Sequence, residues 1–169
     1  YFSALVALDL NQNYESLKFF DSSKHLKESH KSYIKKYIFS LIQSGKIKKA
    51  VNEIKTTKNK KFTDFFEAQL LLVLNSLKNN NYEKSNYYLN NLKLHEEEGT
   101  FEFIVSNFLE EYIYLFNNKK IKTNSEYQFG NLSLINSALQ SCYLGKSNTE
   151  LLFDKITEFD NEGSSRYLF

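Results

Sequence analysis

The stretch that decides the fold is residues 32–57, which reads SYIKKYIFSLIQSGKIKKAVNEIKTT. Its first half places apolar side chains three or four residues apart, which is the spacing of one face of an α-helix. Gly45 follows, and glycine accepts the left-handed backbone conformation in which many helices end. The second half repeats the helical spacing with Ile47, Ala50, Val51 and Ile54. The stretch therefore predicts a helical hairpin with its turn at Gly45.

The same pattern recurs 34 residues earlier and 35 residues later. In each copy a permissive turn residue is followed, at offsets of five, nine and twelve, by a small, a large and a small side chain. A small residue lets a neighbouring helix approach closely, and the large one fills the space beside it. The three copies are Asn11, Ser16, Phe20 and Ser23; Gly45, Ala50, Ile54 and Thr57; and Asn80, Ser85, Leu89 and Leu92, the last of which breaks the size pattern.

This arrangement resembles the tetratricopeptide repeat (TPR), a 34-residue helix–turn–helix unit, and residues 1–94 are similar to bacterial TPR proteins of the divergent kind. The chain lacks Trp and Pro, so the family's early Trp and terminal Pro are absent. Ala4 matches the first-helix position where the family has Gly or Ala, but Ile38 and Val73 do not. The resemblance implies an all-α, right-handed α-solenoid of antiparallel helix hairpins. An all-helical bundle with accidental spacing is the alternative.

We expect a single helical repeat domain over residues 1–169, with repeats at about 1–28, 31–60, 64–95, 100–128 and 131–160 and another that begins at 164. Repeat 100–128 is expected to be irregular because residues 117–130 are mostly polar. The chain starts without Met and stops within a helix-like run, so we interpret it as a fragment of a longer array. No signal peptide or membrane span is visible in the sequence, and the location stays open between cytoplasm and periplasm.

The sequence offers little to catalysis. Cys142 falls on an apolar helix face where we expect a small buried residue, and His25 and His30 are five residues apart, which does not align two metal ligands on a helix. Gly-rich phosphate loops and nucleophile motifs are absent from the sequence. We therefore predict a chain that is not an enzyme and uses no metal or cofactor.

Charge is distributed unevenly along the sequence. Residues 1–61 carry a net charge of +8 and the remainder −6. The lysines of the first third could neutralise phosphates. However, the chain has one Arg, the residue that binds phosphate bidentately. Nucleic acid is therefore the less favoured partner.

A protein or peptide is the partner that we expect. The resemblance implies a concave groove lined by the first helix of each hairpin, where a peptide or a partner helix docks. The groove positions would be Ser32, Lys35, Phe39, Ile42 and Gln43 in the second copy and Glu67, Leu70, Leu74, Leu77 and Lys78 in the third. Such a mixture suits an apolar segment with a few acidic groups. Leu74 and Leu77 could instead be core residues.

We therefore predict a non-catalytic scaffold for protein–protein interaction. The second hypothesis is that the chain is a structural segment of a larger assembly protein. The sequence leaves the oligomeric state open.

Overall fold

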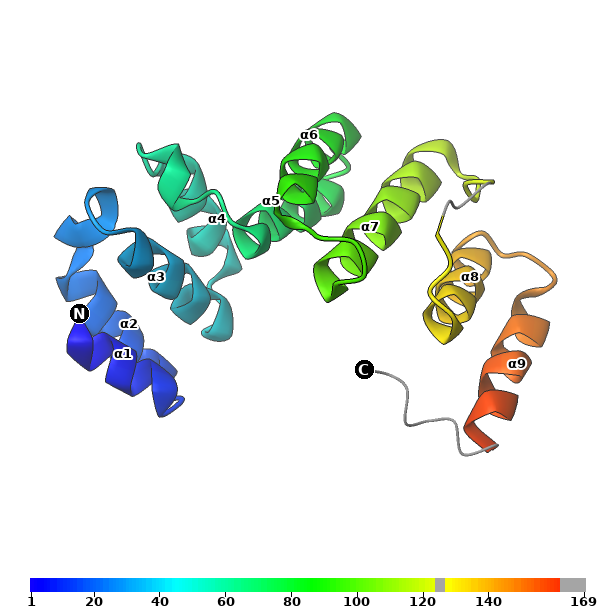
Figure 1. The fold of residues 1–169 in the computed structure, drawn as a ribbon, viewed down its shortest axis with the longest axis horizontal. Coiled ribbons are helices and arrows are strands. Elements are labelled where there is room, and N and C mark those ends of the chain that lie inside the picture. The colour runs from blue at the N-terminus through cyan, green and yellow to red at the C-terminus, as the bar shows by residue number, and fades with distance from the viewer. Residues whose placement is uncertain (124–126, 162–169) are drawn as a thin grey trace. The chain divides into compact units, whose positions relative to one another are not determined.

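The computed structural model describes residues 1–123 and 127–161, and within these ranges the chain is helical and forms no β-strand. The α-helices are α1 Phe2–Asp9, α2 Asn13–Ser22, α3 Lys31–Gln43, α4 Ile47–Thr56, α5 Phe66–Lys78, α6 Tyr82–Leu92, α7 Phe101–Asn118, α8 Asn131–Tyr143 and α9 Thr149–Asn161 (Figure 1). Three 3-10 helices join some of them, namely η1 Lys24–Glu28, η2 Lys60–Phe62 and η3 Lys93–His95. The predicted all-α class is confirmed. The repeat expected to begin at residue 164 lies outside the described residues.

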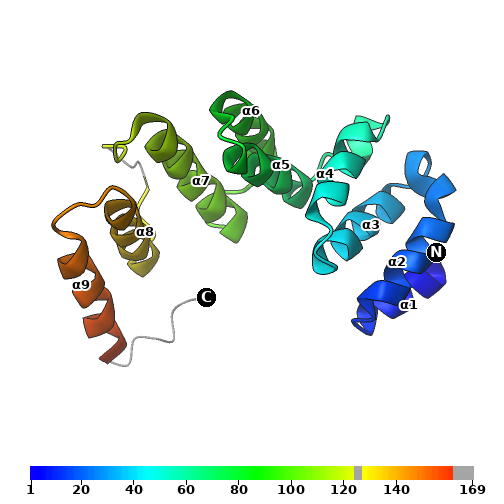
Figure 2. The same ribbon diagram turned by 180° about the vertical axis from the view of Figure 1, so that it is seen from behind.

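The chain divides into two compact units, Tyr1–Lys84 and Ser85–Phe169. In the first unit α1 and α2 form one antiparallel hairpin and α3 and α4 form the next, as the views from both sides show (Figures 1 and 2). α2 also packs against α3, and α4 contacts α5. Consecutive hairpins in this unit therefore meet through the second helix of one and the first helix of the next.

Ser16 lies where three helices of the first unit converge. Its hydroxyl donates to the carbonyl of Ala4 on α1 at 3.2 Å and lies 3.1 Å from the hydroxyl of Ser40 on α3. All three side chains are fully buried. Any larger side chain at this point would push the helices apart, so the small residue does here what its place in the repeated pattern predicted.

Two tyrosines tie α3 to α2. The Tyr33 hydroxyl donates to the Phe20 carbonyl at 2.7 Å, and the Tyr37 hydroxyl donates to the Asp21 carboxylate at 2.6 Å. The rings of Phe20, Tyr33 and Tyr37 lie 5.6–5.8 Å apart. Burial, with nearby acidic charge, raises the pKa of both tyrosines. The hydroxyls therefore stay protonated and keep donating.

Four interhelical turns close in the same way. Asn11, Gly45, Asn80 and Gly145 all have positive φ, between +54° and +69°. In each turn this residue donates its N–H to the carbonyl three residues back, and the next residue donates to the carbonyl five residues back, as Gly45 does to Ile42 at 2.9 Å and Lys46 to Leu41 at 2.8 Å. Every side chain at the small–large–small positions of the three predicted copies is also buried. The predicted turns at residues 11, 45 and 80 are confirmed.

The second unit contains α7 and the α8–α9 hairpin. No helix occurs in the described residues of the loop from Lys119 to Gly130. Glu111 on α7 accepts hydrogen bonds from the side-chain amides of Asn136 and Gln140 on α8. These contacts join α7 to α8.

The expectation that Cys142 is buried is wrong, because its side chain is exposed. Leu139, one helical turn earlier, is also exposed. The buried side of α8 is instead Asn136, Ala138, Gln140 and Ser141. The side chains of Asn136 and Gln140 both face the carboxylate of Glu111. The buried side of α8 is therefore the side that makes these polar contacts, and not the apolar side that the sequence predicted.

The turn at Gly45 leads to a prediction about stability. A Cβ added at Gly45 would meet no atom within 4 Å, so only the backbone conformation opposes a side chain there. Because φ is +69°, we expect Gly45→Ala to lower the free energy of unfolding by about 1 kcal/mol in urea denaturation. Asn11→Gly, at the equivalent turn, should leave it almost unchanged. An unchanged Gly45→Ala protein would contradict this reading of the turn.

Candidate functional site

The predicted groove residues lie on two helices of the first unit, α3 and α5. Counted back from the turn residues Gly45 and Asn80, the two helices align position by position. Lys35 is equivalent to Leu70, Phe39 to Leu74, and Gln43 to Lys78. The same count from Asn11 places Tyr1, Leu5 and Asp9 of α1 in the series, a third set of positions that the sequence analysis did not include.

The central positions of this series are apolar and incompletely covered. Phe39 and Leu70 are half-buried, and Leu74 is 46% exposed. Leu77 is half-buried, while Gln43 and Lys78 at the helix ends are exposed. The alternative that Leu74 is a core residue is therefore wrong, because its side chain reaches solvent.

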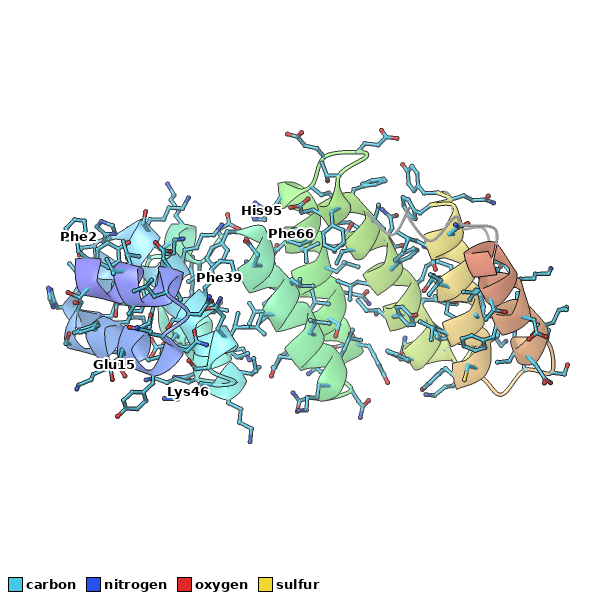
Figure 3. All side chains as sticks on the ribbon, turned by 90° about the horizontal axis from the view of Figure 1, so that it is seen from below. Phe2, Glu15, Phe39, Lys46, Phe66 and His95 are labelled. Carbon is cyan, nitrogen blue, oxygen red and sulfur yellow. The ribbon has the colours of Figure 1, made fainter. Side chains whose placement is uncertain are left out.

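Lys35 connects α3 to the beginning of α5. Its ammonium nitrogen lies 3.4 Å from the Glu67 carboxylate, 5.0 Å from the centre of the Phe65 ring and 5.9 Å from that of Phe39. Figure 3 labels Phe39 on α3 and Phe66, the first residue of α5. The charge of Lys35 is thus shared with a neighbouring carboxylate and two ring faces. Phe65, which was not among the predicted groove residues, directly precedes α5.

The aligned positions form rows of apolar side chains across the three helices. Leu5, Phe39 and Leu74 form one row of equivalent positions, and Leu8, Ile42 and Leu77 form the next. His30 acts as a helix cap, since its Nδ1 accepts the N–H of Tyr33 at 3.1 Å. In the part of the chain that the structure describes, no cluster of three or more His, Cys, Asp or Glu could hold a metal ion. None of the described helices has the length and apolar character needed to cross a membrane.

The acidic side chains beside α4 are already engaged. Glu53 is only 4% exposed and accepts from Lys27 at 2.7 Å, with Lys24 at 3.2 Å. Burial alone would raise the pKa of Glu53, but the two lysines hold it below its ordinary value. Asp21 binds Lys49 at 3.1 Å and the Tyr37 hydroxyl.

Glu28 is engaged by backbone groups. Its carboxylate accepts the N–H groups of Lys58 at 3.0 Å and Asn59 at 3.2 Å, just beyond the end of α4. These backbone hydrogen bonds are the leading cause of a pKa below the ordinary value for Glu28. The carboxylate thus anchors the loop after α4 to η1.

Comparisons of the chain with protein-family models, with curated proteins and with solved structures each gave no match. Any function must therefore be argued from the residues and their geometry.

The buried Glu53 predicts a dependence of stability on pH. Its folded-state pKa is depressed below the ordinary 4.5, so its contribution to stability is present above that value and is lost as pH falls through the folded pKa. We expect Glu53→Gln to lower the free energy of unfolding at pH 7 by about 3 kcal/mol, because it removes the buried carboxylate that pairs with Lys27, whose side chain is only 13% exposed. The variant should also lose part of the stability change of the parent chain below pH 4.5.

Urea denaturation between pH 3 and pH 7 (roughly the range in which carboxylates titrate) measures both effects. Glu15→Gln is the matched control, since no ion pair to Glu15 occurs among the described residues. Equal behaviour of the two variants would show that Glu53 is not the responsible group.

Proposed function

We propose that the chain is a divergent TPR-like array, a right-handed α-solenoid of helix hairpins, and that it serves as a non-catalytic protein-binding scaffold. Its binding face would be the side of the first unit formed by α1, α3 and α5. Two observations support the array: the shared hydrogen-bond pattern of four turns, and the burial of the small–large–small positions of three copies.

The exposure of Leu74 carries the binding proposal. A large apolar side chain that is 46% exposed, in register with the half-buried Phe39 and Leu5, leaves an apolar row uncovered across three helices. Apolar side chains with a polar rim are typical of interfaces. Gln43 and Lys78 supply such a rim at the helix ends.

The charges near this row limit the chemistry of the partner. Lys35 is paired with Glu67, whereas no ion pair to Lys78 occurs among the described residues. The binding face thus offers mainly apolar contact, with the cation Lys78 at its edge. An apolar peptide or amphipathic helix with a single acidic group near one end fits this arrangement.

The binding test uses peptides selected on the parent chain from a random library and then synthesised with a fluorescent label. By fluorescence anisotropy, we expect Leu74→Ala to weaken binding about tenfold, the effect of removing an apolar anchor worth roughly 1.4 kcal/mol. Lys35→Glu combined with Phe39→Ala should abolish it. Leu94→Ala removes a leucine elsewhere that is 78% exposed and should change the affinity by less than about twofold.

Circular dichroism shows whether each variant keeps its helices. If the selected peptides bind folded Leu74→Ala as tightly as they bind the parent chain, or if no peptide is selected, the proposed binding face is wrong.

One observation favours the second hypothesis, a structural segment of a larger assembly. Phe2, Val6 and Leu10 form a stripe along α1 and are 80%, 58% and 62% exposed; Figure 3 labels Phe2. By the turn register, Val6 is equivalent to Ser40 of α3, which is buried against Ser16 of α2. α1 thus presents to solvent the side that α3 uses to pack against a preceding helix.

The structural hypothesis predicts association through that stripe. Sedimentation of the parent chain should show a molar mass that rises with concentration, and Val6→Lys with Leu10→Lys should abolish the rise because it places charge in an apolar contact. Tyr87→Lys changes a similarly exposed ring on α6 and should have no effect. A parent chain that stays monomeric at all concentrations would contradict this hypothesis and leave the peptide-binding proposal untouched.

A further inference from the structure

α4 and the segment that follows it carry lysines that no acidic side chain neutralises. They are Lys46, Lys48, Lys55, Lys58, Lys60 and Lys61, all of them exposed, and we name them the lysine strip. Within the described residues no ion pair involves any of them, in contrast to Lys24, Lys27, Lys35 and Lys49. Figure 3 labels Lys46 at the start of α4.

Two of the three acidic groups beside the strip are paired with lysines outside it. Glu53 is buried under Lys24 and Lys27, and Asp21 is bound by Lys49 and Tyr37. Glu28, which lies closest to Lys58, is engaged by two backbone N–H groups. The exposed carboxylate of Glu28 thus supplies one negative charge beside Lys58. The strip still carries more positive charge than its neighbours balance, and an external anion can neutralise the remainder.

The stability of α4 explains Lys55 in its last turn, which the helix dipole favours, but not the two lysines at its amino end. Its first turn contains no acidic residue, while Lys46 and Lys48 lie at its amino end. The positive end of the helix dipole disfavours cations there by about 0.3–1 kcal/mol each. Lysines that work against the helix that carries them are better explained by something that they bind.

The strip has the length needed to follow a charged polymer. A helix of the length of α4, ten residues, rises about 15 Å. Lys58, Lys60 and Lys61 follow its end, and the Lys60 ammonium donates back to the Lys55 carbonyl at 2.7 Å. One strand of a duplex presents a phosphate about every 3.4 Å along the axis. The lysines can thus contact several phosphates of one strand.

The other exposed side chains along the strip indicate which class of anionic partner it suits. Along residues 46–61 they are the polar Asn52, Thr56 and Asn59 and one apolar residue, Ile47. Protein interfaces depend on aromatic and Arg anchors, membrane surfaces on several inserted apolar side chains, and single strands on aromatic stacking platforms. A duplex backbone needs only cations and polar donors.

We propose that the lysine strip binds the phosphate backbone of duplex nucleic acid without reading its bases. This activity is separate from the peptide-binding face and does not depend on it. The low Arg content made nucleic acid the less favoured partner on sequence grounds. It argues against bidentate binding of phosphate groups, which requires Arg. It does not weaken a backbone contact made by point charges.

The test measures binding of a fluorescent mixed-sequence duplex of about 20 base pairs at about 50 mM salt and upward. We expect Lys48→Gln with Lys55→Gln and Lys58→Gln to weaken binding at least tenfold. The slope of log K against log salt concentration should fall by between two and three, since each lost phosphate contact removes about 0.9. Lys18→Gln with Lys84→Gln and Lys120→Gln removes the same charge from exposed sites outside the strip and should cost less than about twofold.

Three results would overturn the proposal: no duplex binding by the parent chain at the lowest salt, equal losses in the two triple variants, or tighter binding to phosphatidylserine vesicles or polyglutamate than to the duplex. The Leu74→Ala chain should bind the duplex as the parent does. This separates failure of the lysine strip from failure of the peptide-binding face.

Discussion

The close approach of α1, α2 and α3 at Ser16 is the constraint on which the first unit depends. Ser16 contacts the Ala4 carbonyl and the Ser40 hydroxyl in a fully buried position. Small side chains there let three helix backbones meet, and the tyrosines of α3 then reach the Phe20 carbonyl and the Asp21 carboxylate. If the helices moved apart, these buried hydroxyls would lose their acceptors without gaining hydrogen bonds to water. The cost of unpaired donors therefore holds the spacing between the hairpins to one value.

The spacing determines which surfaces remain for function. Packing on α2 and α4 uses one side of α3, so Lys35, Phe39 and Gln43 are left on another side with Glu67 and Leu74 of α5 nearby in register. The outer side of α4 is left to the lysine strip, because Glu53 and Asp21 pair with lysines outside the strip. Two candidate binding surfaces of different chemistry thus arise from one packing arrangement.

Local residue chemistry predicted the fold well where one residue decides the conformation. Asn11, Gly45 and Asn80 were predicted as turns and have positive φ, because few other residues tolerate that backbone. Apolar spacing failed at α8, where the amides of Asn136 and Gln140 turn the helix toward Glu111 and leave Cys142 exposed. The offsets that are buried in the three predicted copies are exposed after Gly145, at Glu150, Asp154 and Thr157.

The amino-acid sequence by itself determined the helical class, the hairpin turns and the small–large–small register, because these depend on backbone preference and on spacing within a single helix. Tertiary structure alone decided that Lys35 is neutralised by Glu67 while Lys48 and Lys55 are not, and that Leu74 is exposed. Charge pairing and burial join residues from different helices. The spacing of residues along one helix does not give the distance between side chains on different helices.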